Sequence, residues 1–372
     1  MKPPVLEGVS GLPVAERLVR LADPRRRRGV RHPFVSVLLI ASCAVLAGAR
    51  SYAAIGQWAA EAPQHALARL GARCATAFAV RIAPSAATIR RVITSVCPGG
   101  LADLLGCDPT GAGTVAVDGK TARGSRQGNK PATHLLAALT GTGQTLTQLR
   151  VPDKTNEITG FARLLAPYDL AGVTITADAL HTQREHIRFL TEKKAHFLLV
   201  VKDNQPTLSK LLRSLPWKDV TARHAARDTG HGRRELRVVK ALTITDLDVD
   251  FPGAVQAARI MRFRTNTRTG KLTRKTVYAI TDLTSRQASP GRLGELARSQ
   301  WGIENRLHYV RDTVFAEDAS RIRTGRGPEN MATLRNFAIS ILRRAGHHSI
   351  AAALRHLSYQ PHTRPLDLIG LP

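Results

Sequence analysis

Residues 114–120 read Thr-Val-Ala-Val-Asp-Gly-Lys, an alternating, β-branched run that ends on the carboxylate of Asp118. Residues 173–178 read Val-Thr-Ile-Thr-Ala-Asp and end in the same way on Asp178. Both runs have the pattern of strands. A third acid, Glu304, lies inside the helix-like segment Trp-Gly-Ile-Glu-Asn-Arg-Leu-His. Because two strands and a helix can bring such oxygen ligands together around Mg²⁺ or Mn²⁺ beside a phosphodiester, the three acids predict a metal-dependent active site.

The segments around these acids are predicted to form an ordered α/β unit. In chain order they give three strands, then a helix, a strand, a helix and a strand: Thr114–Asp118, His134–Thr140, Thr145–Val151, Glu157–Leu165, Val173–Ala177, Thr182–Lys194 and His196–Val201. That order is typical of a ribonuclease-H-like catalytic core. Asp118 and Asp178 would then lie on neighbouring strands, so their side chains can converge.

A change of periodicity near residue 110 divides the chain. Residues 1–108 read as a small helical N-terminal domain, which could bind DNA or mediate dimerisation. Residues 109–350 are the predicted catalytic domain, with a β-rich insertion at about 205–285, and residues 351–372 are a C-terminal tail. The apolar run 34–49 is shorter than the roughly 20 residues that span a bilayer, so it predicts a buried helix and no membrane partner.

The charge of the chain favours a polyanionic partner. Its 372 residues carry 55 Lys and Arg against 28 Asp and Glu, a net charge of +27. Neutralising phosphates releases counterions from DNA, so DNA is the favoured partner, although an arginine-rich composition alone would give the same count. The four cysteines show neither C-x-x-C spacing nor paired histidines, which argues against a zinc site and fits a reduced, cytoplasmic protein.

Polar side chains near the three acids are predicted to contact DNA. They follow the acids on the strands, end the next predicted strand, or lie on the predicted helix: Lys120, Arg123, His181, Gln183, Lys202, Asn204, Gln205, Arg306, His308 and Arg311. The open ends of strands are where α/β sheets bind ligands. His308 and Arg311 follow Glu304 at i+4 and i+7, so they share its helix face. Arg306 points elsewhere and could instead face solvent.

Two further residues beside the acids have specific predicted roles. Gly119 lacks a side chain and would let a backbone approach the substrate closely. Trp301 could stack on a base, but a buried aromatic that anchors the helix of Glu304 is the favoured interpretation.

With these residues in view, the chain resembles a bacterial insertion-sequence transposase of the DDE kind, of the group called ISAs-type or H-repeat-associated. The resemblance rests on several blocks in one order: Ala22–Gly29, Val117–Gly124, Asp153–Ile158, Thr176–Gln183, Val201–Gln205, His231–Glu235, Trp301–His308 and Phe315–Asp318. Several blocks in the same order are more specific than any one of them.

The resemblance implies a catalytic triad of Asp118, Asp178 and Glu304 that also holds two Mg²⁺ or Mn²⁺ ions. It implies hydrolysis of a phosphodiester at the element ends, then strand transfer into target DNA. The implied partners are the double-stranded terminal inverted repeats, the target DNA and a second copy of the chain in a synaptic complex on the nucleoid. It also places Lys154 and Asn156 near DNA, although Asn156 alone would more often cap a helix.

Two other functions fit the same residues. Gln300 stands where this family usually has a basic residue or histidine, and that residue would contact a phosphate. A domesticated or inactive DNA-binding protein that keeps the fold is therefore one alternative. A metal-dependent DNA nuclease without strand transfer is the other.

Overall fold

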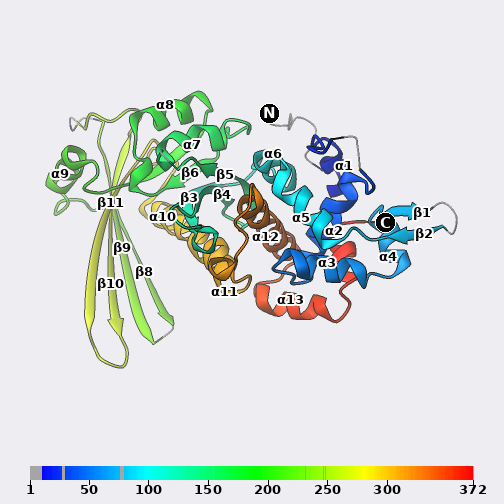
Figure 1. Ribbon diagram of the computed structural model, residues 1–372. Coiled ribbons are helices and arrows are strands. Elements are labelled where there is room, and N and C mark those ends of the chain that lie inside the picture. The colour runs from blue at the N-terminus through cyan, green and yellow to red at the C-terminus, as the bar shows by residue number, and fades with distance from the viewer. Residues whose placement is uncertain are drawn as a thin grey trace.

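The computed structural model describes residues 11–26, 30–75, 79–153, 155–230, 232–245, 247 and 249–371. Within these residues the predicted α/β class is confirmed, and a mixed sheet of nine strands runs through the molecule (Figure 1). The strand order is β5-β4-β3-β6-β7-β11-β10-β9-β8. The first five of these strands are β5 (Thr145–Val151), β4 (Thr133–Thr140), β3 (Thr114–Ala122), β6 (Thr174–Ala177) and β7 (His196–Val201).

The central strand β3 buries both of its faces. Val115 and Val117 enter a core beneath α7 (Glu157–Leu165) and α8 (Arg184–Glu192). Ala116 enters a second core that includes residues of α10 (Pro290–Ile303) and α12 (Gly327–Arg344). Because successive strand side chains point to opposite faces, Asp118 belongs to the α10 face and Gly119 to the α7 face.

Most predicted central elements are confirmed, with small shifts at their ends. The strand predicted at Thr114–Asp118 is longer, because pairing with β4 continues to the pair Ala122 and Thr133. The helix predicted from Thr182 begins at Arg184. Strand β3 pairs antiparallel with β4 and parallel with β6, and β6 pairs parallel with β7.

The region predicted to be β-rich contains four strands, which extend the central sheet. These strands are β8 (Arg223–Gly230), β9 (Arg233–Thr243), β10 (Gln256–Asn266) and β11 (Leu272–Thr281). They pair antiparallel with one another, and β11 pairs with β7. Their far ends project from the body as a long ribbon (Figure 1). Helix α9 (Pro206–Ser214) and strand β8 were not predicted.

Helices from both ends of the chain share one hydrophobic core. The N-terminal helices are α1 (Val14–Val19), α2 (Phe34–Leu46), α3 (Tyr52–Ala60), α4 (Gln64–Arg69), α5 (Ala86–Ser95) and α6 (Pro98–Leu105), with a small hairpin of β1 (Arg73–Ala75) and β2 (Val80–Ile82). They pack with α12, α13 (Ile350–Ser358) and α14 (Arg364–Leu368). The predicted tail at 351–372 is thus helical in most of its described part.

The apolar run of α2 is buried along nearly its whole length, as predicted. Among the described residues, no helix has both the length and the apolar character needed to cross a membrane.

Candidate active site

Strand register brings Asp118 and Asp178 together. The parallel pairing of β3 with β6 ends at the pair Val117 and Ala177, so the next residue on each strand is one of the two acids. Asp118 lies within β3 rather than at its end, which fixes its backbone on both sides. Asp178 follows β6 directly and caps the short turn η2 (Ala179–His181), where its carboxylate accepts a 2.9 Å hydrogen bond from the Leu180 amide.

Glu304 is positioned by a buried glutamine one turn earlier. Gln300 lies on α10 and donates to the Val117 carbonyl at 2.9 Å, while its own carbonyl accepts from the Thr176 hydroxyl at 2.9 Å. These bonds tie α10 to β3 and β6 just before the two aspartates. Because Gln300 is buried and both ends of its amide are engaged, the interpretation of residue 300 as a phosphate contact is wrong.

Glu304 begins a π-helical segment, Glu304–His308, which brings a histidine back towards the acids. His308 Nδ1 lies 3.2 Å from Glu304 Oε2 and 3.4 Å from Asp118 Oδ2. Ligand atoms of Asp118, Glu304 and His308 all lie within 4.8 Å of one another, so this group could hold a metal ion. Asp178 is not part of this close group; its carboxylate caps η2 instead. The hydrogen bond from His308 lowers the pKa of Glu304 more than partial burial raises it, so the carboxylate is ionised at neutral pH.

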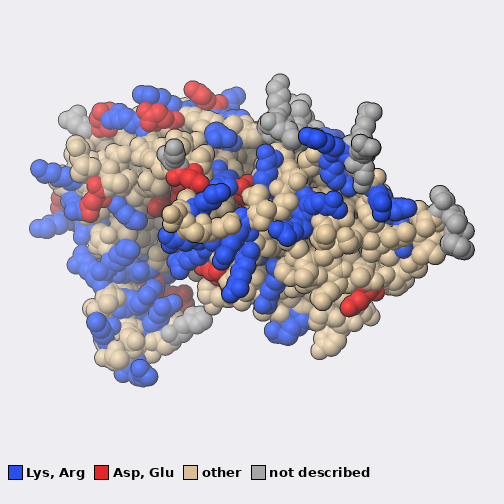
Figure 2. All heavy atoms as spheres, viewed as in Figure 1, with Lys and Arg blue, Asp and Glu red and all other residues tan. Residues whose placement is uncertain are grey.

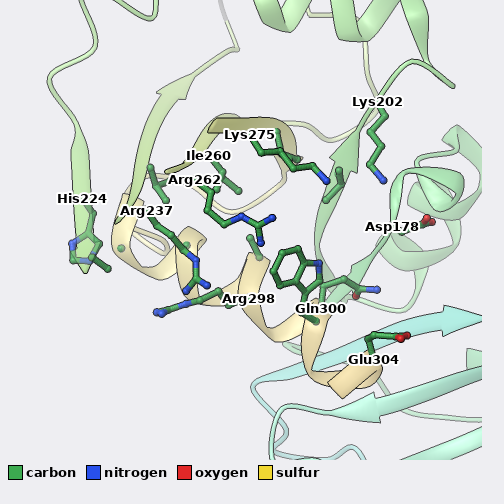
Figure 3. A pocket seen from close by; sticks show the side chains of 18 of the residues that line it. Asp178, Lys202, His224, Arg237, Ile260, Arg262, Lys275, Arg298, Gln300 and Glu304 are labelled. Atoms are coloured by element: carbon green, nitrogen blue, oxygen red, sulfur yellow. The ribbon is translucent and has the colours of Figure 1, made fainter. Parts of the chain in front are cut away.

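The three acids share a cavity of about 310 Å³ with five cationic side chains, three of them from the inserted strands β9, β10 and β11. Figure 3 shows Asp178 and Glu304 on one side, with Lys202 beside Asp178 and Arg237, Arg262 and Arg298 across from the acids. The cations that line the cavity are Lys202, Arg237, Arg262, Lys275 and Arg298. The cavity therefore combines clustered carboxylates with groups that can neutralise phosphates.

Trp301 lies in this cavity, and the prediction that it is a buried anchor is wrong. Its side chain is 47% exposed, and the Arg262 guanidinium stacks over its ring at 4.6 Å from the centroid. Helix α10 needs no anchor at residue 301, since Gln300 already attaches it to the sheet. The tryptophan presents a free aromatic edge to the cavity.

A hydrogen-bond network lies behind β3, on the face away from Asp118. Glu157 Oε1 lies 2.7 Å from His134 Nε2, and Glu157 Oε2 lies 3.2 Å from His181 Nε2. His134 Nδ1 in turn lies 2.8 Å from the Thr121 hydroxyl on β3. Burial of Glu157 opposes its ionisation, but the hydrogen bonds from both histidines outweigh burial and lower its pKa to about 2.

This network was missed, although its residues stand in the quoted blocks or in a predicted strand. His134 was not singled out and no partner was predicted for Glu157, because neither residue shows its partner in the sequence. Gly119 makes room for the network: a side chain there would collide with the Glu157 carboxylate. The prediction that Gly119 serves the approach of substrate is therefore wrong on the α7 face.

Several predicted DNA contacts are buried and paired within the protein. Arg311 is fully buried and binds Glu317 and Gln148. His181 and His308 are buried beside Glu157 and Glu304 as described above. Lys120 is nearly buried and pairs with Asp312 at 2.8 Å and Asp318 at 3.5 Å. His181, His308 and Arg311 are therefore engaged inside the protein, and two aspartates hold the Lys120 ammonium group, so the assignment of these four residues to DNA stays a prediction.

Three predicted contacts brace the loop after Asp178. Gln183 donates to the Leu180 carbonyl, Asn204 to the Ala179 carbonyl and Gln205 to the Thr182 carbonyl. They hold η2 in place from two directions. Asn156 caps α7 by accepting from the Ile158 amide, which is the alternative that the sequence left open.

Other predicted contacts remain accessible. Lys202 is exposed and lines the cavity, and the Arg123 side chain is 80% exposed. Arg306 is exposed and donates to the Gly141 carbonyl at 3.1 Å. Lys154 lies outside the described residues.

Comparison with known proteins gives matches over almost the whole chain. A family model described as "Transposase DDE domain" matches residues 109–341, and a model described as "DDE_Tnp_1-associated" matches residues 15–107. "Putative transposase YncI" of Escherichia coli O157:H7 is 28% identical over 87% of this chain and 85% of its own length. "H repeat-associated putative transposase YhhI" of Escherichia coli K12 is 27% identical over 88% of this chain and 89% of its own.

A solved structure of a piggyBac transposase synaptic complex with hairpin DNA is a more distant match. It covers 95% of this chain and 78% of its own, with 12% identity and a TM-score of 0.39.

Proposed function

Because the chain belongs to the transposase DDE domain family, we propose that it is the DNA transposase of an insertion sequence. It would cleave a phosphodiester at each element end and then join the freed 3′-hydroxyl to target DNA. The observation that carries this proposal is the β3–β6 register, which sets Asp118 beside Asp178 in a cavity that also contains Glu304. The five cationic side chains of this cavity supply the charge that a DNA strand requires.

We assign the five strands β5-β4-β3-β6-β7 to a ribonuclease-H-like core, with β8–β11 as its insertion before Glu304. Their order and directions support this, since three antiparallel strands are followed by two strands parallel to β3. The proposed units are the helical domain 1–108, the catalytic domain 109–350 and the C-terminal segment 351–372. The shared core of N-terminal and C-terminal helices supports treating the first and last as partners.

The residues present suit two Mg²⁺ or Mn²⁺ ions held by Asp118, Asp178 and Glu304. Hard cations of this kind prefer carboxylate oxygens, and the lowered pKa of Glu304 keeps that ligand ionised. When bound, such ions neutralise charge at a phosphodiester and make water a better nucleophile. His308 bonds Glu304 and lies beside Asp118, so it orients these two ligands.

The protein's own groups would bind and position the reacting strand. Lys202, Arg262 and Lys275 line the cavity with the acids, so they would hold phosphates on either side of the scissile bond. Both reactions displace one phosphate oxygen by another, so the same site serves hydrolysis and strand transfer. No covalent link between protein and DNA is required.

The proposed partners follow from this reaction. They are the double-stranded terminal inverted repeats, the target DNA and a second copy of this chain that brings two ends together. The place of action would be the nucleoid in the cytoplasm.

A product analysis tests the proposed function. The purified protein is incubated with labelled element-end duplex and a supercoiled target plasmid, with Mn²⁺ or with chelator. Metal-dependent nicking and end–target joint molecules are expected. Nicking without joining, over several targets, would favour a nuclease. Binding without cleavage would favour a domesticated DNA-binding protein.

A further inference from the structure

A second cavity, of about 570 Å³, lies between the N-terminal helices and the segment that follows the active-site helix. Its walls come from the start of α3, from α5, and from residues 315–316 and 319–324, which lie on either side of the two acids in the short turn η4 (Glu317–Ala319). The charged side chains that line it are Arg50, Arg90, Arg321 and Arg323. No aspartate or glutamate is among the described residues that line this arginine groove.

The four arginines are largely free to bind a ligand. Arg90 makes one long contact, 3.4 Å to the Thr324 hydroxyl. Arg323 donates through Nε to the Gly124 carbonyl at 3.0 Å, which leaves its terminal amino groups available. No described residue pairs with the exposed Arg50 or Arg321. Four like charges around one groove repel one another, so the groove favours an anionic ligand with several charges.

The uncharged lining suits phosphates better than base edges. Helix α3 begins in the groove, with Ser51 as its cap, and its first amides add to the positive potential. Ser320 and Thr324 offer hydroxyl donors, and no asparagine or glutamine is among the described residues of the lining. Arginines, hydroxyls and helix amides are the groups that bind the phosphate backbone of DNA.

The groove adjoins the active site through the end of β3. Arg323 contacts Gly124, six residues after Asp118, and Asp318 of η4 binds the Arg123 amide and Lys120. At about 3.3 Å per residue, the backbone from Asp118 to Gly124 spans no more than roughly 20 Å. Since base pairs rise about 3.4 Å each, this is roughly six base pairs of duplex. Figure 2 shows basic side chains gathered across the middle of this face.

We propose that the arginine groove binds the backbone of the element-end duplex within about six base pairs of the reacting phosphodiester. The proposal rests on the proposed DNA transposase function and adds where the flanking duplex lies. The ligand is held by N-terminal helices and the catalytic unit at once. The DNA would therefore fix α3 and α5 relative to the sheet that carries the acids.

The test compares two triple variants of equal charge. Arg50→Ala, Arg90→Ala and Arg321→Ala together remove three groove charges and keep Arg323, which donates to the Gly124 carbonyl in the turn after β3. The matched control is Arg163→Ala, Arg188→Ala and Arg355→Ala, three exposed arginines on α7, α8 and α13. Affinity for the element-end duplex is measured over a series of salt concentrations, and the melting curve of each variant checks folding.

The groove variant should bind the duplex more weakly than wild type. The slope of its plot of log affinity against log salt concentration should be shallower by about 2.7, because each phosphate that an arginine no longer neutralises removes about 0.9 from the slope. The control should keep the wild-type slope. A duplex cut short of the groove, which ends at the cleavage position, should remove the difference. If the triple variant does not fold, the three single variants should each lower the slope by about 0.9.

Equal slopes for the groove variant and the control would overturn the groove assignment. If the wild-type protein still cleaves end DNA in the presence of metal, the proposed function stands even though the groove assignment fails. Wild-type protein that neither binds nor cleaves end DNA would instead overturn the proposed function.

Discussion

The carboxylate of Glu157 fills the space that a side chain on residue 119 would occupy. Gly119 follows Asp118 on β3, and its missing side chain lets Glu157 lie against the strand from the α7 face. From there Glu157 reaches His134 on β4 and His181 on η2, the turn that Asp178 caps. One partly buried acid thus connects β4, which pairs with the strand of Asp118, to the turn that Asp178 caps.

Substituting Gly119 by alanine should destabilise the protein. The added methyl group would collide with Glu157, and overpacking of this kind costs about 1–3 kcal/mol. Urea unfolding measures the decrease in stability. Gly99→Ala is the control, since a side chain there meets open space and should leave stability equal or slightly higher. Equal effects of both substitutions on the free energy of unfolding would show that the Glu157 side chain can move aside without loss of stability.

Glu157→Gln should raise the Mn²⁺ concentration needed for cleavage by no more than about 10-fold, the lower end of the effect of removing a direct partner of a metal ligand, because Glu157 supports η2, the turn that Asp178 caps, and does not contact the three acids. The amide keeps the shape of the side chain but cannot accept from both histidines. Affinity for end DNA should not change. Glu329→Gln is the control, because Glu329 is buried against Arg150, away from the three acids. If both variants need the same Mn²⁺ as wild type, Glu157 is only a packing residue.

Acid should unfold the protein partly through Glu317. Burial would raise the pKa of this carboxyl, but Arg311 and Arg335 outweigh burial and lower it to about 2, below its usual 4.5. The stability it contributes is therefore complete above about pH 4.5 and is lost as the pH falls towards 2.

Glu317→Gln leaves two arginines buried and should cost about 3–5 kcal/mol at pH 7. Urea unfolding from pH 7 to pH 2.5 should show the gap between wild type and variant closing below pH 4.5. A gap that stays constant over this range would contradict the assignment.

The family and much of the central sheet could be predicted from the sequence. The resemblance to DDE transposases is confirmed by the family match, and the strands at 134–140, 145–151 and 196–201 lie where they were predicted. Alternating apolar residues predict a strand, because successive side chains of a strand point to opposite faces of the sheet and at least one face is buried. The assignment of Asp118, Asp178 and Glu304 as catalytic ligands remains a prediction.

Side-chain partners far apart in sequence could not be predicted. In the sequence Gln300 is only a polar residue on a predicted helix. Its hydrogen bonds to Thr176 and Val117 are visible only in the structure. Arg311 reads as a surface cation until Glu317 and Gln148 surround it. Burial of a polar group depends on a partner from another element, and local pattern carries no information about that partner.

The central claim is that Asp118, Asp178 and Glu304 act together in cleavage of element-end DNA. The most direct test is single-turnover cleavage of a labelled end duplex in Mn²⁺ by Asp118→Asn, Asp178→Asn and Glu304→Gln. Asp103→Asn is the control, a partly buried carboxylate that accepts hydrogen bonds from Thr147 and Tyr168. Each of the three variants should bind the duplex like wild type and cleave at least about 100-fold more slowly, while the control cleaves normally. Wild-type cleavage by any of the three would contradict the claim.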